Sequence, residues 1–289
     1  GPAGTAVLAG ALKGLGFQPV IITDAAYAKL FTIRNLTVVS AEVGDSEAYF
    51  RRLIAEYQPS GMISIERCGI NLREDYENMR GISIREHNAP VDLLFCMAEE
   101  FGIRTVGVGD GGNEIGMGCL ASVIQRELSL VPCRVPVDQL VIASVSNWGA
   151  YGITAYLSIL SRMHLLPEYP EIASYLVQTV DIGSVDGVTH ERVPHVDGFT
   201  EEVEQEIVEA LQDEVLRDAT ETAMRRAKII TETAGASLGK LLSVTYAWRN
   251  IYFEREERSY LASTVACYEA PTFKPQDIEV EEDITFTWE

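Results

Sequence analysis

The residues of this chain best suited to chemistry lie in a glycine-rich stretch at 109–118, which reads GDGGNEIGMG. It directly follows an apolar run at 103–108 and contains five glycines. A strand that ends in glycines opens into a tight loop whose backbone can approach a ligand closely. We therefore expect Asp110, Asn113 and Glu114 to point into whatever the loop cradles. A solvated turn is the simpler alternative, since glycine clusters often only form a turn between two elements.

Two further stretches could hold an anion. Residues 1–5, GPAGT, open a helical pattern, and the free N–H groups at a helix start favour a carboxylate or phosphate. Simple capping explains this start equally well. Glu66 and Arg67 end a strand-like run, where they form either a surface ion pair or an acid/base beside an anion clamp, because a guanidinium suits bidentate carboxylate binding. The position at a strand end favours the functional interpretation.

Histidines offer weaker signals. His87 lies in a long loop of the kind that often forms a functional lid, and it could be a base near neutral pH, although a solvated histidine fits equally well. Asp186, His190, His195 and Asp197 invite a metal interpretation. Their loop context and the lack of tight helical spacing argue against a metal there.

Composition excludes several classes of protein. The 289 residues carry a formal net charge of −20, from 23 Lys and Arg against 43 Asp and Glu. An acidic chain disfavours nucleic acid or an anionic membrane as its main partner. Five scattered cysteines, no spanning run of roughly 18 apolar residues and no signal peptide favour a folded protein of the cytoplasm. Motifs typical of serine hydrolases, zincins, P-loop ATPases and dinucleotide-binding folds are absent from the sequence.

The elements that must position these residues alternate between strand and helix up to about residue 160. Strands are expected at 19–23, 36–40, 61–65, 103–108 and 140–145, and helices at 5–15, 46–57, 90–101 and 149–162. This alternation predicts an α/β fold, a doubly wound, mostly parallel sheet with helices on both faces. Ligands of such sheets bind beyond the carboxyl ends of the strands, and the loops at 23–24, 66–69, 109–118 and 146–149 leave those ends.

The remainder has a different character. An acidic helix is expected at 200–211, a second long helix at 214–234 and a strand at 241–248. Apolar residues at even positions from 278 to 288 predict a half-buried antiparallel strand. We expect a domain boundary near 205–215, which divides the chain into an α/β domain at 1–211 and a small α+β segment at 212–289.

Seven motifs in order resemble one family. They are GPAGT at 1–5, ITD at 22–24, IERCG at 65–69, NMRG at 78–81, the stretch from His87 through Pro90 to Asp92, the glycine-rich loop at 109–118, and VSNWG at 145–149. Together they resemble the catalytic domain of the D-glutamate cyclase family, over residues 1 to about 208. The resemblance implies a lyase that converts D-glutamate to 5-oxo-D-proline with loss of water. The residues that normally precede Gly1 are absent, so the compartment would be the mitochondrial matrix if a transit peptide is missing.

The C-terminal segment is similar to the second half of a SIMPL domain. The matching features are RAK at 226–228, LGK at 238–240, VTYAW at 244–248, PQDIEV at 275–280 and the final TW at 287–288. SIMPL domains often occur in envelope proteins, which conflicts with a cytoplasmic enzyme. The cyclase motifs cover more of the chain and carry the polar chemistry, so we give them more weight. A natural fusion and a chimeric chain both remain open.

Lactam formation requires positioning of a flexible dianion, a base for its ammonium, an acid for the departing oxygen and donors for the oxyanion. The catalytic candidates are Glu66, Asp110 and Glu114. The substrate-binding candidates are Gly4, Thr5, Asp24, Arg67, Arg80, Gly111, Gly112, Asn113, Ser146 and Asn147. No cofactor is evident, although an acid trio could instead bind Mg²⁺ or Mn²⁺.

D-Glutamate is the expected partner, with a homo-oligomer allowed and neither nucleic acid nor membrane expected. Two alternatives remain: a non-catalytic module that binds an amino acid or nucleotide, and an envelope interaction protein defined by its SIMPL-like part.

Overall fold

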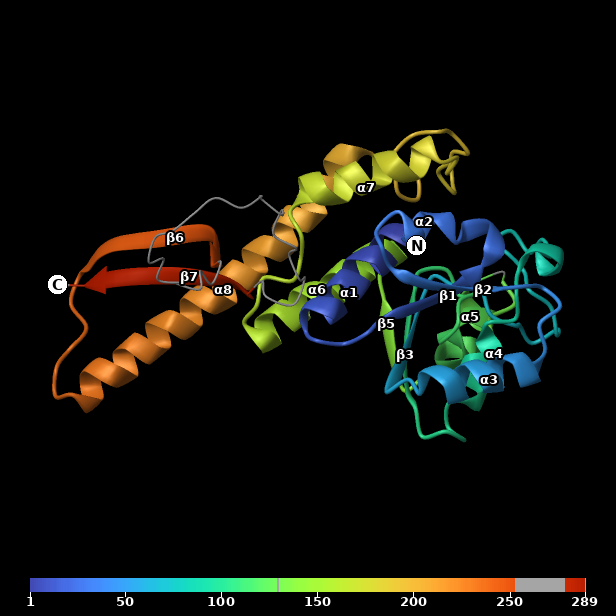
Figure 1. The fold of residues 1–289 in the computed structure, drawn as a ribbon, viewed down its shortest axis with the longest axis horizontal. Helices are drawn as coiled ribbons and strands as arrows, with labels where there is room; N and C mark the ends of the chain where they lie inside the picture. The colour runs from blue at the N-terminus through green and yellow to red at the C-terminus, as the bar shows by residue number, and fades with distance from the viewer. Residues whose placement is uncertain (129, 253–278, 289) are drawn as a thin grey trace, which may run out of the picture. The chain divides into compact units, whose positions relative to one another are not determined.

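The computed structural model describes residues 1–128, 130–252 and 279–288, and from residue 242 onward it describes the backbone alone (Figure 1). The chain divides into two compact units. The first contains Gly1–Leu160 and Leu165–Val215, and the second contains Ser161–His164 and Leu216–Glu289. The predicted division at 211/212 stays a prediction.

The first unit contains two parallel sheets. In one, β1 (Val20–Asp24) pairs with β2 (Thr37–Ala41) in a register that runs from Val20 opposite Thr37 to Asp24 opposite Ala41. In the other, β4 (Arg104–Gly109) lies between β3 (Gly61–Ile65) and β5 (Gln139–Ile142). The predicted α/β class is confirmed, and all five predicted strands form, but they are divided between two sheets because β1 and β3 do not pair.

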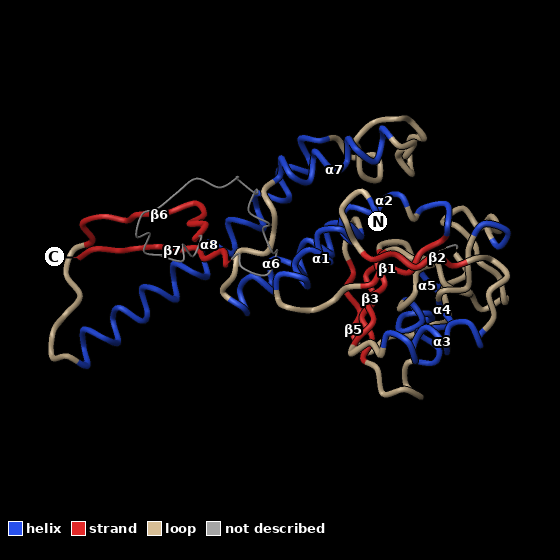
Figure 2. Tube along the Cα trace, in the orientation of Figure 1, coloured by secondary structure: helices blue, strands red, loops and turns tan. Residues whose placement is uncertain are grey.

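Helices connect the strands and cover both faces. Those of the first unit are α1 (Pro2–Gly14), α2 (Lys29–Thr32), α3 (Glu47–Tyr57), α4 (Asp92–Met97), α5 (Ala121–Glu127), α6 (Ser146–Ser161), α7 (Tyr169–Asp181) and the start of α8 (Glu201–Thr233). Short 3₁₀ turns lie at Ala25–Tyr27, Arg85–His87 and Met117–Leu120. Figure 2 shows strands between α1 and α6 on one side and α3 and α4 on the other.

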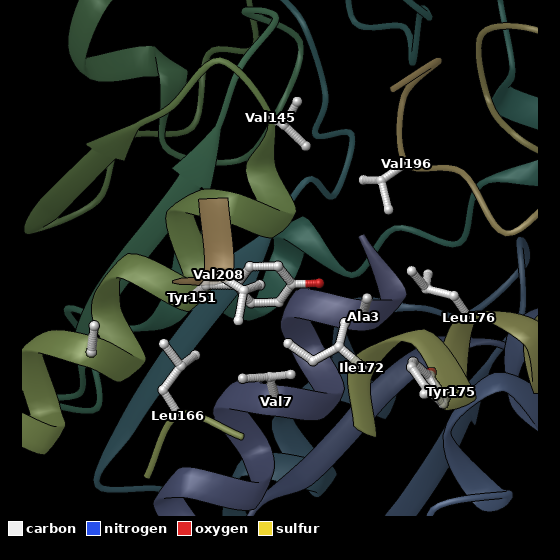
Figure 3. Packing of buried hydrophobic residues seen from close by; sticks show 11 residues of the cluster. Ala3, Val7, Val145, Tyr151, Leu166, Ile172, Tyr175, Leu176, Val196 and Val208 are labelled. Atoms are coloured by element: carbon white, nitrogen blue, oxygen red, sulfur yellow. The ribbon is translucent and has the colours of Figure 1, made fainter. Parts of the chain in front are cut away.

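Apolar spacing on each helix determines which face is buried. One core cluster gathers eleven buried residues from α1, α6, α7, α8 and their loops, including the fully buried Tyr151 and Val208 (Figure 3). A second packs α3 and α4 against the strands through Phe50, Leu53 and Ile54, which recur at helical spacing. Burial of each large apolar side chain contributes about 1.5–3 kcal/mol, so these two clusters hold the strand ends in place.

The start of α8 is attached to the first unit by a buried carboxylate. Glu204 is 1% exposed, and it accepts hydrogen bonds from Trp148 Nε1 (2.5 Å) and from the Tyr151 hydroxyl (2.8 Å) on α6. Burial raises the pKa of Glu204 above its ordinary value, and the two hydrogen bonds oppose that rise only in part. A buried carboxyl with both oxygens satisfied fixes the orientation of the helix that carries it.

Two predicted helices at 200–211 and 214–234 are one continuous helix, α8, of 33 residues. The expected break was wrong because the sequence from 201 to 233 contains neither glycine nor proline to end a helix. In the second unit, β6 (Leu241–Tyr252) pairs antiparallel with β7 (Glu279–Trp288), as predicted for both strands. The half-buried pattern predicted for β7 concerns side chains outside the described ones. None of the helices in the described part is long and apolar enough to cross a membrane.

Candidate functional site

The carboxyl ends of three strands bring polar side chains to one rim of the first unit. Asp24 ends β1, Glu66 and Arg67 follow β3, and Asp110 follows β4. Helix α6 begins at Ser146, after a connection of three residues from the end of β5 at Ile142. This is where a parallel α/β sheet places a ligand site, and the structure therefore brings together loops that are far apart in the sequence.

Three carboxylates meet at the centre of this rim. Glu66, Asp110 and Asp197 each offer an oxygen, and these oxygens all lie within 4.8 Å of one another. Glu66 has φ 55° and Asp197 has φ 51°, a left-handed backbone that few residues other than glycine adopt. Both of these non-glycine residues have this conformation, and their carboxylates lie at the same point. The surrounding structure therefore holds their backbone in a conformation that these residue types disfavour, which is typical of a functional site.

Asp197 has an unusual protonation equilibrium. Burial, together with the charges of Glu66 and Asp110, raises the pKa of Asp197 to about 7. Its Oδ2 atom is buried and has no hydrogen-bond partner in the described structure. Like charges this close cannot all ionise freely, so one carboxyl keeps its proton into the neutral range. A carboxyl that exchanges protons near pH 7 is suited to general acid and base chemistry.

Asp110 is held by the start of α6. The Ser146 backbone N–H and hydroxyl both donate to Asp110 Oδ2, over 2.7 Å and 2.6 Å. A carboxylate at the N-terminus of this 16-residue helix also meets the positive end of its dipole. The predicted role of Ser146 is therefore indirect in this structure, because Ser146 orients Asp110.

Glu114 faces its own loop. It is 2% exposed and accepts hydrogen bonds from the amides of Gly111 (2.8 Å) and Gly112 (2.6 Å). Burial raises the pKa of Glu114, while the two amides oppose that rise. Because Gly112 has φ 111°, only glycine suits this turn. The amides predicted to hold a substrate oxyanion are thus already bonded to a carboxylate of the chain.

Arg67 and Asp24 pair with each other. Both terminal nitrogens of Arg67 donate to the Asp24 carboxylate, and Nη2 also donates to the Ala89 carbonyl. Burial opposes ionisation of Asp24, but the hydrogen bonds from Arg67 and the Ala89 amide, with the Arg67 charge, lower its pKa below the ordinary value. Three of the five N–H groups of Arg67 are thus engaged within the chain, and its Nε–H is a buried donor without a partner among the described residues.

Helix α1 is placed by close contact with α6. The Gly4 N–H donates to Asn147 Oδ1 over 2.8 Å, and the Thr5 hydroxyl donates to the Gly1 carbonyl. A Cβ on Gly4 would lie 2.8 Å from the Cβ of Ala150, so only glycine allows this approach. The Gly1 nitrogen lies 2.5 Å from Glu66 Oε2. Gly4, Thr5 and Asn147 thus align the two helix starts beside the carboxylates.

A cavity of about 260 Å³ opens beside the cluster. Its lining residues are Glu66, Asn78, Met79, Arg80, Asp110, Asn113, Glu114, Gly187 and His190. Asn113 is anchored by a hydrogen bond from Nδ2 to the Glu77 carbonyl (2.9 Å). The exposed Arg80 side chain has no hydrogen bond or ion pair within the described residues. The cavity combines the Arg80 cation with three carboxylates, Glu66, Asp110 and Glu114, which suits a small zwitterionic ligand.

The observed trio differs from the predicted one. Glu66 and Asp110 come together as expected, but the third carboxylate of the cluster is Asp197 in place of Glu114. Asp186, grouped with Asp197 as a rejected metal set, accepts amide hydrogen bonds from Val188, Thr189 and Gly198 and so shapes its loop. His190 lines the cavity, whereas His87 is exposed and lines neither cavity described here.

A divalent cation fits the same residues. Three carboxylate oxygens within 4.8 Å are the hard oxygen donors that Mg²⁺ and Mn²⁺ prefer. Any such site would consist of Glu66, Asp110 and Asp197, not of the predicted trio with Glu114.

Comparison with known proteins gives two family matches and one curated relative. Residues 1–212 match the family model described as D-glutamate cyclase-like, C-terminal, and residues 146–288 match the SIMPL model, described as a protein of unknown function. The two matches overlap over 146–212. A curated human protein named D-glutamate cyclase, mitochondrial, is 38% identical over 112 residues. This alignment covers 37% of the chain and 18% of the human protein.

Proposed function

Because the chain belongs to the D-glutamate cyclase-like family, we propose that it is a lyase that closes D-glutamate into 5-oxo-D-proline and releases water. The observation that supports this reaction best is the cluster of Glu66, Asp110 and Asp197 beside the cavity that contains Arg80. The cluster can hold the ammonium group of the substrate, and it offers an acid/base group at the same point. Ring closure requires both.

The reaction is balanced without any added reagent. The substrate nitrogen bonds to the carbon of the side-chain carboxylate, and one oxygen of that carboxylate leaves as water. The nitrogen loses two protons between ammonium and lactam, and the departing oxygen gains two. A group that takes protons from the nitrogen and returns them to the oxygen therefore completes the cycle unchanged.

The three carboxylates divide this task. Glu66 and Asp110 accept hydrogen bonds from the substrate ammonium, since their carboxylate oxygens lie at the same point of the rim. Asp197, with a pKa of about 7, takes a proton from the nitrogen and returns one to the departing oxygen. Arg80 binds a substrate carboxylate across the small cavity. Holding amine and carboxyl carbon together supplies about 7–11 kcal/mol of the barrier.

A metal-assisted version of the reaction is the second candidate. If the cluster binds Mg²⁺ or Mn²⁺, the ion polarises the substrate carboxyl group. Glu66, Asp110 and Asp197 would then be its ligands, because they supply the oxygen donors.

The proposed substrate and compartment rest on further observations. The four cysteines in the described part, Cys68, Cys96, Cys119 and Cys133, are free thiols, which supports a reducing compartment. We propose the cytoplasm or the mitochondrial matrix, and the name of the human relative calls that protein mitochondrial. The chain acts on free D-glutamate, and a homo-oligomer is compatible with this role.

The test uses the full chain with D-glutamate and L-glutamate in separate reactions, with 5-oxoproline measured by chiral chromatography. We expect product from the D-enantiomer alone, and its loss on addition of EDTA would support the metal-assisted version. The matched control is Asp197→Asn, which removes the acid/base group while keeping the side-chain size. No product above the uncatalysed background from folded protein refutes the lyase, and D-glutamate binding without turnover would favour the binding module.

A further inference from the structure

The two parallel sheets of the first unit leave a gap between β1 and β3. Within the described residues, β1 pairs with β2 alone and β3 pairs with β4 alone. Each therefore has one edge whose backbone N–H and C=O groups meet no strand. A cavity of about 780 Å³ is lined by residues 20–23 of β1 and 63–65 of β3. Two unpaired edges on one cavity form a template for strand pairing.

Burial supports an incomplete sheet at this point. In β4, which has a strand on each side, Thr105 is 5% exposed and Val108 is fully buried. In β3, Ile63 is 38% exposed, and residues 20–23 of β1 are all only half-buried. Strands of a parallel sheet that is covered by helices on both faces are normally buried. Ser64 also lines the cavity at 4% exposure, and its hydroxyl has no partner in the described structure.

Direction and connectivity identify the occupant. The carboxyl ends of β1 and β3 meet, because Arg67 just after β3 donates to Asp24 at the end of β1. A strand between them can therefore run parallel to both. Residues Gly1 and Pro2, at the start of α1, line the same cavity. A strand that ran toward this rim would end where α1 begins, and α1 leads directly to β1, which makes a βαβ unit.

We propose that the gap between β1 and β3 is the seat of one further parallel strand, an extended apolar segment of polypeptide that runs directly into Gly1. Its length is about five residues, since β1 and β3 have five each. With this strand in place the two sheets become one, in the order β2, β1, added strand, β3, β4, β5. Numbered along the chain this is 3-2-1-4-5-6, the doubly wound order, in which the ligand crevice lies at the switch point beside the first strand.

The experiment compares two extensions of the full chain. One places Val-Ile-Val-Ile-Val directly before Gly1, and its matched control places Gly-Ser-Gly-Ser-Gly there. Hydrogen exchange is measured by mass spectrometry on the soluble monomers of both proteins and of the unextended chain. We expect the apolar extension alone to slow exchange in β1 and β3 by about tenfold or more, with β4 and β5 little changed, and to raise the thermal midpoint.

Several outcomes would overturn the proposal. Exchange in β1 and β3 that is the same in both extended proteins would show that the gap does not take a strand, as would loss of soluble monomer from the apolar extension. Slow exchange in the unextended chain that depends on protein concentration would assign the gap to a second copy, and protection by added D-glutamate would assign it to a ligand. These readouts require no turnover, so they are independent of the proposed function.

Discussion

Asp197 couples the stability of this protein to pH, and Asp197→Asn should remove that coupling. Burial and the neighbouring Glu66 and Asp110 raise the pKa of Asp197 from 3.8 to about 7 in the native state. The native protein therefore binds more protons than the unfolded chain between these two values. The contribution of Asp197 to stability is complete below about pH 4 and is lost as the pH rises through 7. The asparagine variant, which has no proton to lose, avoids this loss.

The size of the effect follows from the two pKa values. The interval between 3.8 and about 7 corresponds to about 4 kcal/mol, at about 1.4 kcal/mol for each factor of ten in proton affinity. Asp197 is only half-buried, so solvent screening reduces this figure. Between pH 5 and pH 8, we expect the stability of Asp197→Asn to rise by about 1–2 kcal/mol relative to the original protein.

Urea unfolding at pH 5, 6, 7 and 8 measures this difference, because all other titrating groups are shared by the two proteins. Asp181→Asn is the matched control, since it removes an exposed carboxylate at the end of α7, outside the cluster. We expect the free energy of unfolding of this control to change with pH as that of the original protein does. The argument that Asp197 keeps a proton in the native state would be refuted if the unfolding free energies of Asp197→Asn and of the original protein differed by the same amount from pH 5 to pH 8.

The remaining predictions concern the loop, the cation and the unit boundary. Asp110→Asn should lower kcat/KM for D-glutamate about 10–100-fold with little change in the thermal midpoint, because it removes a charged acceptor of the substrate ammonium, whereas Glu114→Gln should cost about 1–3 kcal/mol of unfolding free energy, because its carboxylate accepts hydrogen bonds from two buried amides. Equal thermal midpoints for these two variants would contradict this division of roles. Arg80→Gln should raise the KM for D-glutamate about tenfold or more, while Arg73→Gln, an exposed arginine that does not line the cavity, should leave it unchanged. A chain that ends at Val215 should remain folded and keep its turnover, as measured by circular dichroism and product formation; loss of turnover in a folded fragment would place part of the site beyond that residue.

The strands and the rim could be predicted because their signals are local. Short apolar runs that end in glycine or charged residues predicted β1 to β5, and the loops that leave them carry Glu66 and Asp110. Helix α7 was missed although its signal is in the sequence, since Pro170 lies in its first turn and Ile172, Tyr175 and Leu176 recur at helical spacing. The division into two sheets could not be predicted, since strand pairing depends on which edges meet and not on the pattern of any one strand.

The site was predicted in part for a similar reason. Glu114 lies in the richest motif of the chain, but a carboxylate two and three residues after glycine amides can fold back onto them, and this one does. Asp197 lies almost ninety positions after Asp110 in a loop, so its approach to Glu66 depends on tertiary structure. Its sequence signals were a place among the acids and histidines at 186–197, which invited a metal interpretation, and the turn-forming pair Asp197 and Gly198, which marks a bend without giving its direction.

The carboxylate cluster also explains how a chain with a net charge of −20 could select an amino acid over a simple dicarboxylate. Three carboxylates with oxygens within 4.8 Å repel one another unless a proton or a cation lies among them. In the proposed reaction, the α-ammonium group of D-glutamate would supply that cation, whereas a dicarboxylate without an amine would add charge of the wrong sign. Discrimination would then act on the nitrogen that must react, and the contacts that select the substrate would also hold its nucleophile in place.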